Sequence, residues 1–238
     1  MRMSTTIDET DPRLAESRVL IVGVGGLGAP AARALATAGV GTLVLVDPDR
    51  VEVSNLHRQP LYETADVGRP KVEVAAARLR ALHPGLRVVI RQERFAADQL
   101  GGADVALDGT DSIAAKFAVN DACVGAGIPL VHAGVLGFRA QLLTVLPGRS
   151  ACYRCVFEDA PPPGDVPSCQ DAGVLGPVPA LAAALQVAEA LRLLTGGRAA
   201  FADLLLTIDT REGRYRGVPV TPNPRCPVCL PIGRSKAS

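Results

Sequence analysis

The sequence lacks an excess of charge of either sign. Its 25 Lys and Arg residues balance 24 Asp and Glu residues, which leaves a formal net charge of +1 over 238 residues. Proteins that bind nucleic acid through a broad electrostatic field carry a clear basic excess. We therefore expect no DNA partner.

A membrane span and an export signal are also missing. The most apolar stretch, residues 172–194, is interrupted by Pro, Gly, Gln and charged residues and is typical of a buried helix. The N-terminal segment 1–17 is polar and acidic, with neither the apolar centre of a signal peptide nor the arginines of a transit peptide. We expect a cytoplasmic protein with no membrane partner.

Histidine is scarce, and the chain shows no internal repeat and no domain linker. His57, His83 and His132 are scattered, so we assign none of them to a metal or to catalysis. The apolar content of 48% argues against disorder, and the length suits one domain with a sizeable core. We predict a short polar tail at 1–17, one domain at 18–232, and a second tail at 233–238.

Strands and helices alternate through the first part of the chain. Such alternation predicts a Rossmann-like, doubly wound α/β fold with a mainly parallel sheet. The sequence predicts strands at 17–23, 40–47, 86–92, 103–111 and 128–135, and helices at 25–39, 68–85 and 112–127.

The pattern changes after residue 137. Three further strands, at 138–147, 203–210 and 214–220, are predicted to extend the sheet as antiparallel additions. A long apolar helix is predicted at 177–197, with Pro near its start and a Gly pair at its end. The proline-rich segment 158–168 is predicted to be a mobile loop.

A glycine-rich turn lies between the first strand and the first helix. The segment GVGGLG (23–28) has the G-x-G-x-x-G form through Gly23, Gly25 and Gly28, with Gly26 inside it. Glycines there let the backbone approach a phosphate, and Asp47, at the end of the next strand, can accept hydrogen bonds from a ribose. The motif predicts a nucleotide site, but it does not choose NAD over ATP, and a turn without a ligand is the alternative.

The loop after the second strand, DPDRVEVSNLHRQ (47–59), carries more polar chemistry than NAD binding requires. Reaction at a triphosphate needs cations and an acid that can hold a divalent metal. Arg58 and Lys71 supply cations, and Asp108 and Asp111 follow the fourth strand. Each residue alone is well explained as a surface charge, but their joint placement favours a triphosphate site.

Four of the six cysteines form two C-x-x-C pairs. In a cytoplasmic chain two such pairs favour a metal over disulfides, and four thiolates complete a tetrahedral site, for which zinc is the best candidate. Redox activity of the pairs is the alternative. The pairs are CYRC (Cys152 and Cys155) and CPVC (Cys226 and Cys229).

Several longer motifs identify a family. GVGGLGAP, LVDPDRVEVSNLHRQ, DVGRPKVEVAAARL, LDGTDS, NDAC, CYRC, AGVLGP and CPVC occur in this order between residues 23 and 229. The chain resembles the MoeB/ThiF/HesA family, the bacterial relatives of ubiquitin-activating enzymes. The resemblance covers nearly the whole chain.

The resemblance implies an ATP-dependent reaction with Mg²⁺. The C-terminal glycine carboxylate of a ubiquitin-like sulfur carrier ending in Gly-Gly would be adenylated, with release of pyrophosphate. The four paired cysteines would bind structural zinc, and Asp111 would bind Mg²⁺. The implied nucleotide set comprises Gly23, Gly25, Gly26, Gly28, Asp47, Asp49, Asn55, Arg58, Gln59, Lys71, Asp108 and Asp111.

The remaining cysteines differ in expected role. Cys169 directly precedes the segment QDAGVLGP, and the resemblance implies a nucleophile that links covalently to the carrier, whereas the alternative is an exposed bystander thiol. Cys123 lies on an apolar helix face and is expected in the core.

The match departs from the family near the N-terminus. The resemblance implies a homodimer in which an arginine of an RYxRQ-like motif reaches the partner's ATP site, but Arg2 and Arg13 have no such surroundings. No sulfurtransferase domain follows CPVC, so we expect a separate sulfur donor. Alternatives are adenylation of another carboxylate, an NAD-dependent oxidoreductase, or a catalytically silent scaffold that binds the carrier.

Overall fold

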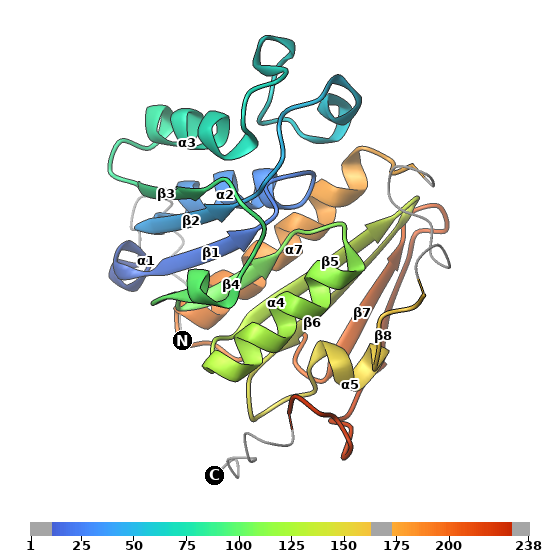
Figure 1. Ribbon diagram of the computed structural model, residues 1–238. Helices are drawn as coiled ribbons and strands as arrows, with labels where there is room; N and C mark the ends of the chain where they lie inside the picture. Colours follow the sequence, from blue (N-terminus) through green and yellow to red (C-terminus); the bar gives the residue numbers. More distant parts are fainter. Residues whose placement is uncertain (1–10, 163–172, 230–238) are drawn as a thin grey trace.

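The computed structural model describes residues 11–162 and 173–229, which form one eight-stranded mixed sheet (Figure 1). The strands lie in the order β3-β2-β1-β4-β5-β6-β7-β8. The first five are parallel, and β6, β7 and β8 add antiparallel neighbours, which confirms the predicted fold class. Their bounds are β1 (Arg18–Val22), β2 (Thr42–Val46), β3 (Arg87–Arg91), β4 (Val105–Asp108), β5 (Leu130–Leu136), β6 (Arg139–Val145), β7 (Leu204–Asp209) and β8 (Arg214–Pro219).

Helices cover both faces of the sheet (Figure 1). One apolar cluster joins the sheet to α2, α3 and α7, and the other joins it to α4 and the start of α5. Because both faces are covered, the central strands read as continuous apolar runs. The helices are α1 (Pro12–Glu16), α2 (Gly28–Thr37), α3 (Lys71–Leu82), α4 (Ile113–Ala126), α5 (Tyr153–Phe157) and α7 (Pro177–Leu194), with short 3-10 turns η1 (Val53–Arg58), η2 (Thr64–Asp66) and η3 (Ala97–Leu100).

The strand order reverses at β1. The chain runs outward from β1 to β2 and β3 on one side, then returns to place β4 on the other side. The carboxyl ends of β1, β2 and β4 therefore meet at one edge of the sheet, where doubly wound folds bind their ligands. Gly23, Asp47 and Asp108 lie at these three ends.

Helix α7 is long and apolar enough to cross a membrane by length and composition alone. It lies in the protein's core instead, since it packs against α2, β5 and β6, and 44% of it is buried. Core helices of globular proteins pass the same test, and the prediction of a buried helix agrees with this packing.

The sequence analysis did not predict the short elements of the described chain, which are α1, α5 and the turns η1, η2 and η3. Residues assigned to a polar tail form α1, in which Leu14 is buried and the Arg13 guanidinium donates to the Thr195 carbonyl at 2.6 Å. Most of the predicted loop 158–168 lies outside the described residues.

Candidate functional site

The glycine-rich turn has no room for side chains at two of its positions. Gly23 adopts φ +86°, and a Cβ added to Gly28 would lie 1.8 Å from the Gly23 carbonyl oxygen. A Cβ on Gly25 would approach the side-chain nitrogen of Gln59 to 3.3 Å. Because no side chain intervenes, backbone N–H groups at the start of α2 are open to an anion.

Asp47 braces this turn. Its carboxylate accepts from the Val24 N–H at 2.6 Å and from the Asp49 N–H at 2.8 Å. Burial raises the pKa of Asp47, and the nearby Lys71 opposes that effect. The Tyr62 hydroxyl holds the same turn from the other side by donating to the Val24 carbonyl at 2.7 Å.

The crowded loop folds as η1 and brings three side chains to the same edge of the sheet. Arg58 donates to the Asn55 side-chain oxygen at 2.6 Å. Gln59 is 3% exposed, and its side-chain oxygen has no hydrogen-bond partner among the residues that the structure describes. A buried amide oxygen without a partner is costly in a finished protein, which is a reason to expect a ligand group beside it.

Lys71 begins α3 with its ammonium 2.9 Å from the Asp49 carboxylate. The lysine side chain is 6% exposed and that of Asp49 is 63% exposed. A cation at a helix N-terminus opposes the helix dipole, so an anion is the expected partner.

The turn after β4 separates two acids that the sequence grouped together. Asp111 is exposed and lines a large cavity, whereas the Asp108 carboxylate is fully buried and does not line that cavity. Asp108 accepts from the N–H and hydroxyl of Thr110 at 2.9 and 2.7 Å. It therefore lies beneath the turn that carries Asp111. Unlike most of the predicted nucleotide residues, Asp108 is not in contact with the cavity.

This cavity measures about 1670 Å³ and is lined by most of the predicted nucleotide residues. Small-molecule sites typically measure about 300–1000 Å³. The cavity continues over strands β6 to β8, beside Arg139, Arg214 and Arg216, so it has room for a nucleotide and the end of a second chain. Of the predicted set it is lined by Gly23, Gly25, Gly26, Asp47, Asp49, Asn55, Arg58, Gln59, Lys71 and Asp111, while Gly28 and Asp108 lie behind its wall.

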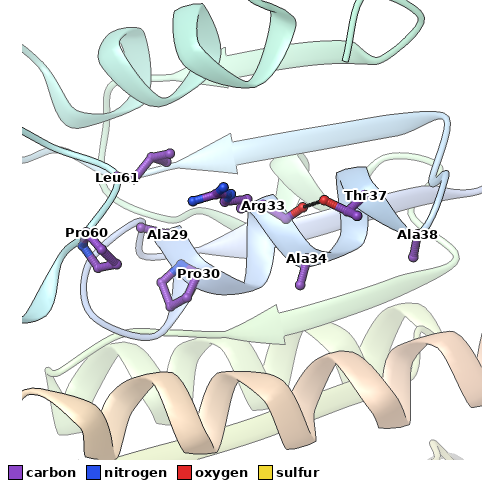
Figure 2. A pocket seen from close by; sticks show the side chains of 8 residues that line it. All are labelled: Ala29, Pro30, Arg33, Ala34, Thr37, Ala38, Pro60 and Leu61. Atoms are coloured by element: carbon purple, nitrogen blue, oxygen red, sulfur yellow. Dashed lines mark hydrogen bonds between the residues drawn. The ribbon is translucent and has the colours of Figure 1, made fainter. Parts of the chain in front are cut away.

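A smaller hollow of about 470 Å³ lies against α2 (Figure 2). Its only ionisable side chain is Arg33, and Thr37 bonds to the Arg33 carbonyl within the helix. No carboxylate, cysteine or histidine is among its lining residues, so we place the reaction in the larger cavity. The hollow is lined by Ala29, Pro30, Arg33, Ala34, Thr37, Ala38, Pro60 and Leu61.

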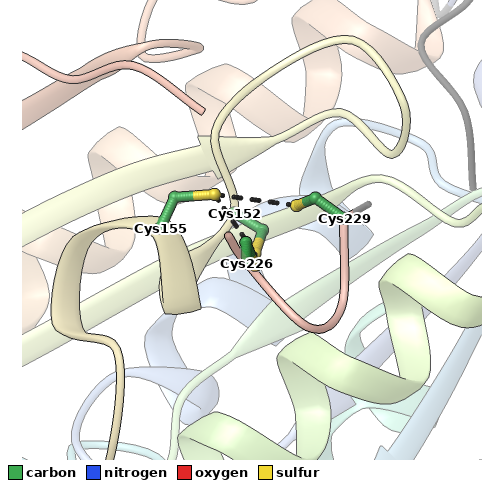
Figure 3. A group of neighbouring side chains, drawn as sticks. All are labelled: Cys152, Cys155, Cys226 and Cys229. Atoms are coloured by element: carbon green, nitrogen blue, oxygen red, sulfur yellow. Dashed lines mark hydrogen bonds between the residues drawn. The ribbon is translucent and has the colours of Figure 1, made fainter. Parts of the chain in front are cut away.

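The four paired cysteines converge on one point (Figure 3). Three Sγ···Sγ distances are 3.7, 3.7 and 3.8 Å, and all four sulfurs lie within 4.8 Å of one another. A tetrahedral zinc with Zn–S bonds of about 2.3 Å requires Sγ atoms about 3.8 Å apart. The cluster of Cys152, Cys155, Cys226 and Cys229 can therefore hold zinc.

Cys152 is the thiolate of the cluster. Contact with Cys229 lowers the pKa of Cys152 to about 5, against the opposing effect of burial. Burial raises the pKa of Cys155, and contact with Cys152 raises that of Cys229, so one thiol is ionised before a metal adds its own charge. The thiolate is the form that binds metal. Cys123, by contrast, is fully buried in the core as expected, and burial raises its pKa to about 12. Cys169 lies outside the described residues.

Sequence reasoning missed the groups that surround Asp108. His132 donates its Nδ1–H to the Asp108 carboxylate at 2.7 Å, and the Lys116 ammonium lies 3.2 Å away. The Gln186 side chain donates to the Asp108 carbonyl at 2.9 Å. The expected parallel order of the strands could have revealed this contact, because β4 and β5 are neighbours and place Asp108 opposite His132.

The sequence profile of the ThiF family matches residues 1–228. The chain belongs to the ThiF family. Sulfur carrier protein adenylyltransferase of Thermus thermophilus is 44% identical over 230 residues, which cover 93% of this chain and 85% of that protein. Sulfur carrier protein ThiS adenylyltransferase of Escherichia coli is 42% identical over 222 residues, covering 91% and 87%.

Solved structures agree with this assignment. The crystal structure of E. coli MccB with ATP superposes with a TM-score of 0.79 at 26% sequence identity, covering 92% of this chain and 68% of that one. The similarity includes the parallel core and its antiparallel extension, so the fold of the whole described chain is that of the family.

Proposed function

We propose that the protein is an ATP-dependent adenylyltransferase that activates the C-terminal Gly-Gly carboxylate of a ubiquitin-like sulfur carrier protein. The observation that carries the proposal is the cavity at the strand-order reversal. It gathers a glycine turn, the cations Arg58 and Lys71 and the acids Asp47, Asp49 and Asp111, and it is larger than a nucleotide alone requires. The names of the two similar adenylyltransferases support the same reaction.

The residues divide into those that bind the nucleotide and those that act on its phosphates. Asp47 accepts from the ribose, since each carboxylate oxygen has a second lone pair beyond its present hydrogen bond. The turn at Gly25 and Gly26 and the start of α2 offer N–H groups to phosphate oxygens. Asn55 holds Arg58, and Asn55 and Gln59 line the cavity where they would position the adjacent phosphates.

The reaction joins a carboxylate oxygen of the carrier to the α-phosphorus of ATP. The bond from that phosphorus to the bridging oxygen of the β-phosphate breaks, and pyrophosphate leaves with the electron pair. Arg58 and Lys71 neutralise the charge that develops on the phosphates. No general base is needed, because the attacking carboxylate is already ionised at neutral pH.

Asp111 is the exposed acid that would hold Mg²⁺. The chemistry of the site fits the ion, because Mg²⁺ binds proteins through one or two carboxylates together with substrate phosphates. Bound Mg²⁺ would neutralise charge on the phosphates. The four-cysteine cluster would hold zinc in a closed, structural site, as its sulfur spacing supports.

The proposal also covers the oligomeric state, the location and the sulfur donor. The enzyme would act as a homodimer in the cytoplasm, and sulfur would come from a separate donor. Arg13 is engaged within its own chain by Asp11 and Thr195, so Arg13 is not available to a partner subunit, and either another residue substitutes for the family's arginine or the activity is weakened or specialised. Cys169 is the candidate for covalent linkage to the carrier.

ATP–pyrophosphate exchange tests the proposal. Purified protein is assayed with Mg²⁺, with and without a carrier ending in Gly-Gly, beside Lys71→Ala and the matched surface control Arg33→Ala. We expect carrier-dependent exchange that Lys71→Ala lowers by a factor of about 100–1000 and Arg33→Ala retains.

Other results would point to the alternatives. Exchange stimulated by a different carboxylate would replace the proposed substrate. Protein that binds ATP but supports no exchange with any carrier would be the silent scaffold. Binding of NAD in preference to ATP would indicate the oxidoreductase.

A further inference from the structure

The residue beneath the Asp111 turn is itself held from three directions. One oxygen of Asp108 accepts both hydrogen bonds from Thr110, and the other lies 2.7 Å from His132 Nδ1 and 3.2 Å from the Lys116 ammonium. Gln186 from α7 holds the Asp108 carbonyl at 2.9 Å. Both carboxylate oxygens are thus occupied by partners within the chain.

The charges in this group balance. Burial would raise the pKa of Asp108, but Lys116, His132 and Thr110 outweigh burial and hold the pKa below its ordinary value. Burial, assisted by Lys116, lowers the pKa of His132, so its ring is neutral at pH 7. The Lys116 cation therefore compensates the Asp108 anion, and neutral His132 donates its Nδ1–H without adding charge.

The same group fixes the backbone that presents Asp111. The two hydrogen bonds from Thr110 fold the chain sharply after β4, and Gly109 packs so closely that an added Cβ would lie 2.9 Å from the Gly23 carbonyl oxygen. Asp111 directly follows Thr110 and is the first residue of an exposed segment. Its position relative to the glycine turn therefore depends on Asp108.

We propose that His132 is a positioning residue: acting through Asp108 and Thr110, it holds Asp111 where it binds the metal of Mg²⁺–ATP. Lys116, which lines the cavity, supplies the charge that balances Asp108. The inference rests on the proposed function for the role of Asp111. His132 does not line the cavity: its Nδ1 lies on Asp108, and the centroid of its ring is 4.5 Å from that of Tyr153. Groups behind a metal ligand typically change metal affinity or activity by about 10–100-fold when they are removed.

The test compares two substitutions of one residue. His132→Asn keeps an N–H donor close to the position of Nδ1, whereas His132→Leu keeps similar bulk without a donor. ATP binding is measured by titration calorimetry over a series of Mg²⁺ concentrations and again in EDTA, without a carrier, and thermal unfolding is followed for each variant.

We expect His132→Leu to raise the Mg²⁺ concentration for half-maximal ATP binding by about 10–100-fold. Binding in EDTA should change by less than about threefold, and His132→Asn should recover most of the Mg²⁺ dependence. If His132→Leu does not fold, the same comparison is made with Thr110→Val, which loses the hydroxyl that donates to Asp108, and Thr110→Ser, which keeps it.

Three outcomes would overturn the inference. One is a folded His132→Leu variant with unchanged Mg²⁺ dependence and only a lower unfolding temperature. Another is a His132→Asn variant as defective as His132→Leu, because then the donor is not what matters. The third is wild-type protein whose ATP binding does not respond to Mg²⁺. Wild-type protein that binds Mg²⁺–ATP normally but supports no exchange would count against the proposed function alone.

Discussion

Lys71 and Asp49 form an ion pair with very unequal exposure, since the lysine side chain is 6% exposed and the aspartate side chain 63%. The ammonium is held in place by the protein, while its partner faces solvent. An arriving phosphate can replace the carboxylate without moving the cation. Asp49 therefore keeps Lys71 oriented until a nucleotide binds.

Asp49→Asn should strengthen ATP binding, by up to about fivefold. The substitution removes a competing anion from a pair whose exposed half limits its strength to about 1 kcal/mol. Calorimetric titration with ATP measures the change, and Glu73→Gln, on the first turn of α3, serves as the control for loss of one acid. A tenfold weakening instead would mean that Asp49 binds the nucleotide or its metal directly.

Gly28→Ala should destabilise the protein by several kcal/mol, because its Cβ would lie 1.8 Å from the Gly23 carbonyl oxygen and the turn would have to open. Gly125→Ala is the matched control, since no atom lies within 4 Å of its added Cβ and it lies in α4. That control should gain about 0.5–1 kcal/mol from helix propensity. Denaturant unfolding of both variants checks the contrast, and similar stabilities would contradict the crowding argument.

Cys226→Ser should abolish stoichiometric zinc binding and lower the unfolding temperature. Cys152 and Cys226 are 74 residues apart, and a crosslink over that span stabilises a fold by about 4 kcal/mol through loop entropy. For a protein of this size the loss corresponds to roughly 8–16 °C. Metal analysis and thermal unfolding give the result.

Cys123→Ala is the matched control for the zinc prediction, since Cys123 is fully buried but lies outside the cluster. It should keep its zinc and lose only about 1 kcal/mol, the size of a small core truncation. Purified wild-type protein without zinc, or zinc retained by Cys226→Ser, would contradict the prediction.

The stability of the wild type should fall below pH 6.5 more steeply than that of His132→Asn. Burial lowers the pKa of folded His132 below the ordinary histidine value of 6.5, so the unfolded chain binds the extra proton first as pH decreases. The contribution is fully present above pH 6.5 and is lost by up to about 1.4 kcal/mol per pH unit below it. Urea unfolding from pH 5 to 8 measures the difference, and parallel curves would mean that the pKa of His132 is the same in the folded and the unfolded chain.

The parallel core could be predicted from the sequence because apolar strands and helical segments alternate regularly. The location of the site followed from the same order, since polar residues such as Asp47 and Arg58 come after strands that end at one edge. Short elements such as α1, α5 and η1 were missed because a few residues carry no readable periodicity.

The role of Asp108 was harder to foresee. As the last residue of β4, its side chain falls on the same face as Ala106, toward α4, rather than out of the strand end toward the cavity. That alternation was available in the sequence, but the partners that balance the charge come from other elements, Lys116 from α4 and His132 from β5. Pairing across elements requires the tertiary arrangement.

The four-cysteine cluster joins the segment that follows β6 to the last residues of the described chain. Cys152 and Cys155 emerge from the ribosome well before Cys226 and Cys229, and the second pair follows β8, the final strand. A complete tetrahedral site therefore exists only after the sheet can close. Capture of the metal would be a late event in biosynthesis, and a metal-loaded molecule would be one whose synthesis has passed its last strand.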